Sequence, residues 1–506
     1  MTSINSNISA LRAQASLAGN ARKLDTSMER LSTGIRINSA KDDAAGLAIT
    51  NRMTSQINGL NQAVRNANDG ISMVNTVEGA LLQTTNVLQR MRELAVQSGN
   101  DSNSTEDRQF LQAEIVQLAS EVDRLASQSR FNGIQVLNGD FTNKQLQIGA
   151  GTGETISFSV DSAASSDIGV WQSRQGQVGA LAADTALPTS SIVADTITVS
   201  GFLGDEDITV DAADDAYSVA EAINDEFANT GVKATAMTKA MISDLSAAGT
   251  VTFDITGKND TAVTVSATIT DTSDLTELAS AFNTFSAQTG VTATLSSDKT
   301  QVLLTSNAGY NIGVAEYSNT SSGATITVKG MEGDAEADDA GLTTTANGYE
   351  AAIVLTDNGN DSTLIVGDVL FSSTKAFTVD AAAGVNSTTG FVGTTAVAAG
   401  LETVADIDIS SSSGAGAAIT ILDGAIGKVS GMRGELGAIA ARLEKTVDAL
   451  TASSTNTAAA RSRILDTDYS AETSALAKAQ IIAQASTAML AQANQQPQMV
   501  LKLLQS

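Results

Sequence analysis

A single run of apolar residues constrains the fold of this chain more than any other feature of its sequence. From Ile57 to Ala95, apolar or small residues recur without a break at steps of three and four, which gives a period of about 3.5 residues. That period places the whole run on one side of an α-helix, so the pattern predicts one long coiled-coil-like helix. A helix striped in this way is stable mainly through packing of its apolar side against other helices.

Two further helices are predicted to cover that stripe. A polar break from Ser98 to Thr105 ends the first helix, and Glu106 opens a second one with an apolar face of its own. Near the other end of the chain, the same spacing predicts a third helix over roughly 423–453. The residues that carry it are Leu436, Ile439, Leu443, Thr446 and Leu450. We expect a bundle built from residues 41–160 and 421–464, in which the two ends of the sequence meet.

Residues 1–40 and 465–506 lie outside this bundle. Both segments have apolar residues at helical spacing, but Gly19, Gly34 and Pro497 weaken isolated helices. Ordering about 38 residues costs more free energy than burying their few large side chains returns. We therefore expect these terminal helices to be disordered in the monomer and to fold against neighbouring copies. The residues expected to mediate self-assembly are Ile4, Ile8, Leu11, Leu24, Leu31, Leu476, Leu490, Val500, Leu501, Leu503 and Leu504.

The middle of the chain, residues 161–420, has the alternating Thr, Val, Ile and Ser pattern of β-strands. It also contains an internal repeat with an offset of 59 residues, whose copies span about 195–237 and 251–296. Each copy reads as strand, short helix, glycine turn and strand. The predicted fold class is therefore multidomain α+β: terminal coiled-coil helices form an inner bundle, and mainly β and small α+β outer domains are inserted in the middle.

Charge divides the chain along the same boundaries. Residues 1–140 and 421–506 together have 21 basic and 21 acidic side chains, whereas the stretch between them has 8 basic and 35 acidic ones. Neutral striped ends can pack against copies of themselves, and an acidic middle keeps the surface that it covers in water. The net charge of −27 disfavours nucleic acid and anionic membranes as partners.

The chain has no Cys and no His. This composition excludes thiol nucleophiles, His-based triads and thiolate zinc sites. The acidic residues form no second cluster that would accompany Lys41-Asp42-Asp43 as a metal or acid–base site. We therefore predict no enzyme activity, no metal and no cofactor. The sequence begins without an apolar signal segment and has no stretch of about 18 apolar residues.

Several segments make the comparison with a known family specific: ISALRAQASL, RLSTGIRINSAKDDAAGLAI, LQRMRELAVQS, FNGIQVLNG, AARSRILDTDY and TAMLAQANQQPQMVLKLLQ. In these segments the chain resembles bacterial flagellin over about its first 150 and last 85 residues. The resemblance implies an extracellular subunit of the flagellar filament, exported unfolded through the flagellar type III apparatus. It also implies an inner tube made of the terminal helices, a surrounding bundle with a short hairpin near Gly139 to Val160, and outward-facing middle domains.

The same resemblance implies several partners besides the chain itself. They are the filament cap and hook-junction proteins, an export chaperone at the C-terminal helix, and host Toll-like receptor 5. The matching receptor-recognition positions are Gln89, Arg90, Leu94, Gln97 and Glu114. We expect the primary role of these residues to be contacts between subunits and within the bundle, with recognition by the receptor secondary.

Two other interpretations stay open from the sequence. A hook–filament junction protein resembles flagellin at both ends, although the LQRMRELAVQ and TAMLAQANQ segments favour the filament subunit. Alternatively, a secreted adhesin would use its acidic outer modules to bind a surface ligand. The simpler view of those modules is a solvated spacer that changes the filament surface.

Overall fold

The structure, a computed structural model, describes residues 7–100, 102–190, 192, 194–259, 261–332, 352–357, 359–381 and 396–504. It divides into two compact units. Unit 1 comprises Met1–Asn75, Asn143–Ser159 and Leu436–Ser506, and unit 2 comprises Thr76–Thr142 and Val160–Glu435.

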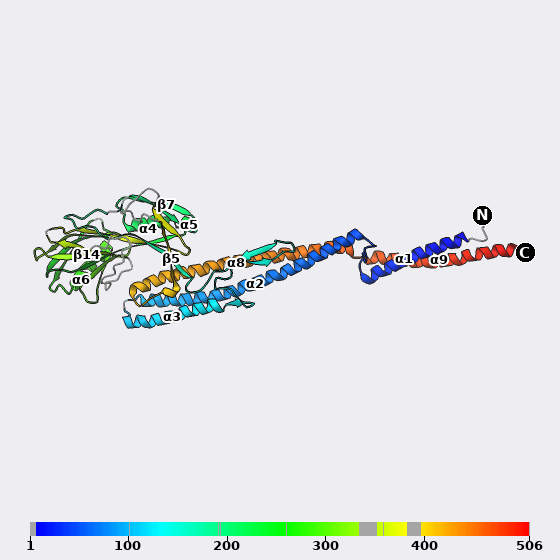
Figure 1. Cartoon of the computed structure of the whole chain (residues 1–506), viewed down its shortest axis with the longest axis horizontal. Coiled ribbons are helices and arrows are strands. Elements are labelled where there is room, and N and C mark those ends of the chain that lie inside the picture. The colour runs from blue at the N-terminus through cyan, green and yellow to red at the C-terminus, as the bar shows by residue number, and fades with distance from the viewer. Residues whose placement is uncertain are drawn as a thin grey trace. The chain divides into compact units, whose positions relative to one another are not determined.

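The ends of the described chain form two antiparallel helices in unit 1. Helix α1 (Ile8–Thr33) begins where the Asn7 side chain accepts a hydrogen bond from the Ala10 amide, and it ends at Gly34 in the left-handed conformation. Helix α9 (Tyr469–Leu504) lies beside α1, as the blue and red helices of Figure 1 show. Asn20 donates to the Ala479 carbonyl at 2.6 Å. The helices are thus joined by small and polar contacts.

A second part of unit 1 is built from α2 (Ala44–Ser98) and α8 (Ser412–Leu465), together with a hairpin. Strands β3 (Lys144–Gln147) and β4 (Thr155–Phe158) form that hairpin, which agrees with the hairpin expected near residues 139–160. Leu146 approaches α2 at Gly70, where a larger residue would overlap it. The core here is small and consists of Ala67, Ile71, Leu146, Ile148, Ile156, Ile439, Leu443 and Val447.

In unit 2, residues of α2 and α8 pack with α3 (Thr105–Gln128). Helix α3 begins with a capping box, in which Ser104 and Asp107 each bind the other's backbone amide. Arg92 forms an ion pair with Asp423 at 2.6 Å, and Arg433 forms one with Glu78 at 2.7 Å. Helix α2 ends at Ser98, at the start of the predicted polar break. The residues predicted to form one bundle, 41–160 and 421–464, are divided between the two units.

The third helix is longer than the 423–453 that the heptad pattern predicts, because it runs from Ser412 to Leu465. Its N-terminal flank continues the buried face with Ala415, Ala418 and Leu422, at steps of three and four, and neither flank contains Pro, so both can continue the helix. Short elements complete this part of unit 2: β1 (Arg130–Phe131), β2 (Ile134–Gln135) and a 3-10 turn at Val404–Asp406.

The middle of the chain is β-rich, and all strand pairs recorded for its described residues are antiparallel. One sheet has the order β10-β9-β13-β16-β8-β12-β11, with β14, β15, β5 and β19 attached; a smaller sheet has the order β18-β17-β6-β7. The strands are β5 (Gly169–Ala180), β6 (Asp195–Ser200), β7 (Asp205–Val210), β8 (Lys233–Ser243), β9 (Gly249–Thr256), β10 (Val263–Ile269), β11 (Val291–Leu295), β12 (Val302–Ser306), β13 (Ile312–Asn319), β14 (Thr325–Met331), β15 (Ile353–Thr356), β16 (Thr363–Ser373), β17 (Thr378–Ala381), β18 (Val397–Ala398) and β19 (Gly400–Thr403).

The internal repeat is visible in the structure as two modules with the same local geometry. The first contains α4 (Ala216–Asp225) and α5 (Phe227–Thr230), and the second contains α6 (Thr276–Thr284) and α7 (Ser286–Thr289). The Asn224 side chain exchanges two hydrogen bonds with the backbone of Ala234, at 2.8 and 2.9 Å. Asn283 does the same with Ala293, at 2.7 and 2.8 Å. In each copy the order of elements is strand, helix, glycine turn and strand.

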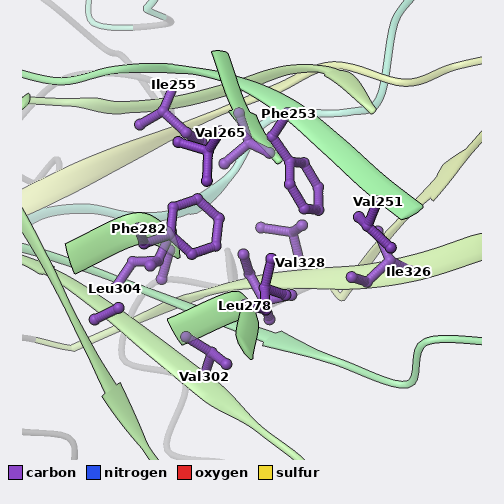
Figure 2. Packing of buried hydrophobic residues seen from close by; sticks show 14 of the residues in the cluster. Val251, Phe253, Ile255, Val265, Leu278, Phe282, Val302, Leu304, Ile326 and Val328 are labelled. Atoms are coloured by element: carbon purple, nitrogen blue, oxygen red, sulfur yellow. The ribbon is translucent and has the colours of Figure 1, made fainter. Parts of the chain in front are cut away.

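Each module has an apolar core under its helix. Figure 2 shows the core of the second module, where Phe253, Leu278 and Phe282 meet side chains from several strands. The first module buries a separate cluster that includes Ile197, Ile223 and Phe371. Strands β8 and β16 contribute residues to both clusters, so the two modules share strands.

Candidate assembly and recognition surfaces

The terminal helices expose large apolar side chains. On α1, Ile8, Leu11 and Met28 are exposed, and on α9, Ile481 and Met489 are exposed. The exposed fraction reaches 61% for Leu11 and 66% for Ile481. Within the described residues of these two helices, the buried ones are small or polar: Ala10, Asn20, Ser27 and Ala479. Contiguous exposed apolar surface marks sites where a protein meets a partner.

The residues expected to mediate self-assembly divide into three groups. Ile8 and Leu11 are exposed, as an intermolecular contact requires. Leu24, Leu31, Leu476 and Leu490 are half-buried along α1 and α9. Val500, Leu501, Leu503 and Leu504 belong to α9, but their side chains, like Ile4 as a whole, lie outside the described residues.

The expected receptor positions lie on α2 and α3 of unit 2. Arg90 forms an ion pair with Glu114 at 3.0 Å and a second one with Glu93 at 3.1 Å. The hydrogen bond to Glu114, followed by the one to Glu93, raises the pKa of the Arg90 guanidinium above its ordinary value. Gln89, Arg90, Gln97 and Glu114 are all exposed. These four side chains are available to a partner at the surface of the folded bundle.

Leu94 differs from the other four, because only 1% of it is exposed. It lies one helical turn from Met91, which is also buried, so its side chain belongs to the apolar side of α2. In the folded bundle Leu94 is therefore a core residue, and its side chain is unavailable for direct contact.

Four exposed apolar residues of the bundle were not singled out from the sequence: Leu82, Val96, Phe110 and Val116. Phe110 and Val116 each lie next to a residue of the apolar stripe of α3, Leu111 and Ile115. Neither residue fits the spacing of three and four that the stripe of α3 follows, so each lies on another side of the helix. That position is the sequence signal that could have identified them as contact candidates.

The chemistry of the site is that of a contact surface. Within the described ranges, no group of three or more acidic, His or Cys side chains could hold a metal ion. Among the helices described, none is both long and apolar enough to cross a membrane. The Asp42 carboxylate accepts hydrogen bonds from Asn38 and Ser39, and Asp43 accepts one from Gly46 at the start of α2. These carboxylates have a structural use in the turn before α2.

Three family models match the chain. The bacterial flagellin N-terminal helical region matches residues 4–142, the bacterial flagellin C-terminal helical region matches residues 419–504, and the flagellin hook IN motif matches residues 196–247. The last match covers the first module of the repeat. The second module has the same pair of asparagine hydrogen bonds as the first, and its Gly290 has the same left-handed conformation as Gly231.

Full-length relatives agree with these matches. The chain is 39% identical to the B-type flagellin of Pseudomonas aeruginosa over 503 residues, which cover 99% of each chain. It is 34% identical to flagellin B of Vibrio cholerae over 501 residues, again 99% of each. A solved structure of FliC from Burkholderia pseudomallei is 18% identical, with a TM-score of 0.29 over 73% of this chain and 98% of that one. On the family models and the full-length identities, the chain belongs to the bacterial flagellin family.

Proposed function

We propose that this flagellin, a structural subunit of the flagellar filament, polymerises through the exposed apolar side chains of α1 and α9. The observation that carries the proposal is the exposure of Leu11 and Ile481 on helices whose described buried residues are small or polar. Contacts of this kind are heterologous, since a surface on one copy meets a different surface on the next. Heterologous contacts that do not close into a ring produce an open helical polymer.

Assembly and ordering are coupled in this proposal. The terminal helices of the free subunit are weakly held and order fully when neighbours cover them. A chain without Cys can pass unfolded through an export channel without forming disulfides. The proposal includes export through the flagellar type III apparatus, with an export chaperone bound at α9. The filament then grows from the hook-junction proteins, under a cap. In this proposal the assembled chain lies outside the cell, in the filament.

A hook–filament junction protein is the alternative within the same machine. Full-length identity to proteins named flagellin supports the filament subunit instead. Electron microscopy of the purified chain, seeded with short filament fragments, tests the proposal. Long tubes are expected, and a chain with intact ends that stays monomeric under these conditions would refute it.

Recognition of the free monomer by Toll-like receptor 5 is a second proposal. Gln89, Arg90, Gln97 and Glu114 form an exposed polar surface on which the Arg90–Glu114 ion pair orients both side chains. Leu94 has a positioning role in this proposal, because its buried side chain holds α2 in the core beneath the four exposed residues.

A reporter cell line that carries the receptor tests this proposal. We expect Arg90→Ala to weaken the response to monomer at least tenfold, since a charged hydrogen bond across an interface contributes about 1.5 to 3 kcal/mol. Arg124→Ala is the matched control, because Arg124 is also an exposed bundle arginine paired with a nearby glutamate, Glu121. An equal dose response for Arg90→Ala and wild type would contradict the proposal.

A further inference from the structure

The first module of the repeat has an exposed apolar patch that its copy lacks. In the described part of residues 161–420, the large apolar side chains that are exposed are Phe202, Leu203, Phe227 and Val354. Phe202 and Leu203 lie in the turn between β6 and β7, and Phe227 begins α5. The turn contacts the end of α5, because the Leu203 amide donates to the Thr230 carbonyl and the Phe202 ring lies against Gly231. Three of the four side chains therefore gather at one place.

Two lysines complete this patch. The Lys233 ammonium lies 5.1 Å from the centre of the Phe227 ring, and the Lys375 ammonium lies 5.4 Å from the centre of the Phe202 ring. Neither lysine forms an ion pair with a residue that the structure describes. They are two of only eight basic residues between positions 141 and 420, where 35 residues are acidic. We call Phe202, Leu203, Phe227, Lys233 and Lys375 the cationic aromatic patch.

The duplicate module shows that the fold does not need these side chains. At an offset of 59 residues, the second copy has Thr261, Ala262, Ser286 and Thr292 in place of Phe202, Leu203, Phe227 and Lys233. Its nearby aromatic residue, Phe285, packs against the core instead. The second module nevertheless keeps the same helix, glycine turn and asparagine hydrogen bonds. A set of exposed aromatic and basic side chains that folding does not require is a contact surface.

We propose that the cationic aromatic patch docks on the acidic outer surface of a neighbouring copy in the polymer. This inference rests on the proposed function, because polymerisation is what holds acidic outer regions of other copies close to the patch. Charge complementarity identifies the occupant, because Lys233 and Lys375 form no ion pair with a described residue and residues 141–420 of each copy contain 35 acidic and 8 basic residues. Between free monomers the contact is weak, because both partners have a large negative charge. In the polymer the effective concentration overcomes that repulsion.

Site-specific cross-linking tests the contact directly. The chain has no Cys, so a single introduced cysteine can be labelled with a photoreactive group without other changes. We place it at Leu203, and the matched control at Ala262, the exposed residue at the corresponding position of the second module. In filaments, the Leu203→Cys probe is expected to give several-fold more cross-linked dimer than the Ala262→Cys probe. Peptide mapping should place those links in residues 161–420 of the other copy.

Charge reversal adds a second arm. The double change Lys233→Glu and Lys375→Glu should lower the Leu203→Cys cross-link yield several-fold, and raising the salt concentration should do the same in the unchanged protein. The control pair, Lys258→Glu and Lys299→Glu, alters formal charge equally on the second module and should leave the yield unchanged.

Four outcomes would overturn the inference. Equal cross-linking from Leu203→Cys and Ala262→Cys in intact filaments would refute the contact and leave the filament function standing. Links that map to the helical bundle would refute the acidic occupant. Binding of polygalacturonate that is lost with Lys233→Glu and Lys375→Glu, without subunit links, would assign the patch to an acidic polysaccharide. If the chain forms no filaments at all, the proposed function fails and this inference fails with it.

Discussion

Replacement of Leu11 by Ala tests how the terminal helices contribute to assembly. Leu11 lies on α1 with 61% of its surface exposed in the single chain. Full burial of a leucine side chain stabilises by roughly 1.5 to 3 kcal/mol, so covering the exposed part contributes about 1 to 2 kcal/mol. Because 1.4 kcal/mol is a factor of about ten in an equilibrium constant, Leu11→Ala should raise the critical monomer concentration roughly fivefold to thirtyfold.

Sedimentation of seeded polymerisation mixtures measures that critical concentration. Val354→Ala is the matched control, because Val354 is also an exposed apolar residue but lies on β15, in the middle region. The control should leave the critical concentration unchanged. Helical content of each variant, from circular dichroism, establishes that the monomer is intact. An unchanged critical concentration for folded Leu11→Ala would refute the assignment of α1 to the contact surface.

Three further predictions concern local structure. Asn224→Ala removes both hydrogen bonds to Ala234 and should destabilise the first module by about 2 kcal/mol. Amide exchange should show the largest loss of protection in α4 and β8. Equal protection in wild type and variant would contradict this prediction. Gly231→Ala places a methyl group at a φ of 73° and against the Phe202 ring. It should lower the free energy of unfolding of the first module by at least about 1 kcal/mol, and its melting temperature with it. A variant as stable as wild type would contradict this prediction and show that the turn relaxes. Hydrogen bonds from Ser104 lower the pKa of Asp107. This carboxylate therefore stabilises α3 fully at pH values above the ordinary Asp pKa of about 3.9, and the effect is lost as the pH falls through the lowered pKa. Asp107→Asn should flatten the acid dependence of amide protection at the start of α3.

The helices were predictable because their signals are local and periodic. The stripe from Ile57 to Ala95 and the polar break after Ser98 give the end of α2 and the start of α3 directly. The extra N-terminal turns of α8 were not predicted, because Ala415 and Ala418 continue its buried face with small side chains, which give a weaker periodic signal than large apolar ones. The sequence left open whether Leu94 lies within the bundle or at its surface, and its place one turn from the buried Met91 corresponds to the first of these.

The sheets were predictable only in part. The alternating pattern and the 59-residue repeat give strands and short helices in the order in which the structure has them. These local patterns do not predict that the two modules share β8 and β16. Pairs such as Val369 and Ala236 lie more than a hundred positions apart in the sequence. The cationic aromatic patch was invisible for the same reason. Phe202, Phe227 and Lys375 come together only through those long-range pairings.

The disorder expected for the free terminal segments remains a prediction. The central claim of the assembly account is that these segments supply the contacts that build the filament. Deletion of residues 1–40, or of residues 465–506, tests it when combined with sedimentation and electron microscopy of the seeded variant. The account predicts that either truncated chain stays soluble, keeps the cooperative unfolding transition of unit 2, and forms no filaments at any concentration that polymerises the full chain. Filaments grown from a truncated chain would contradict it.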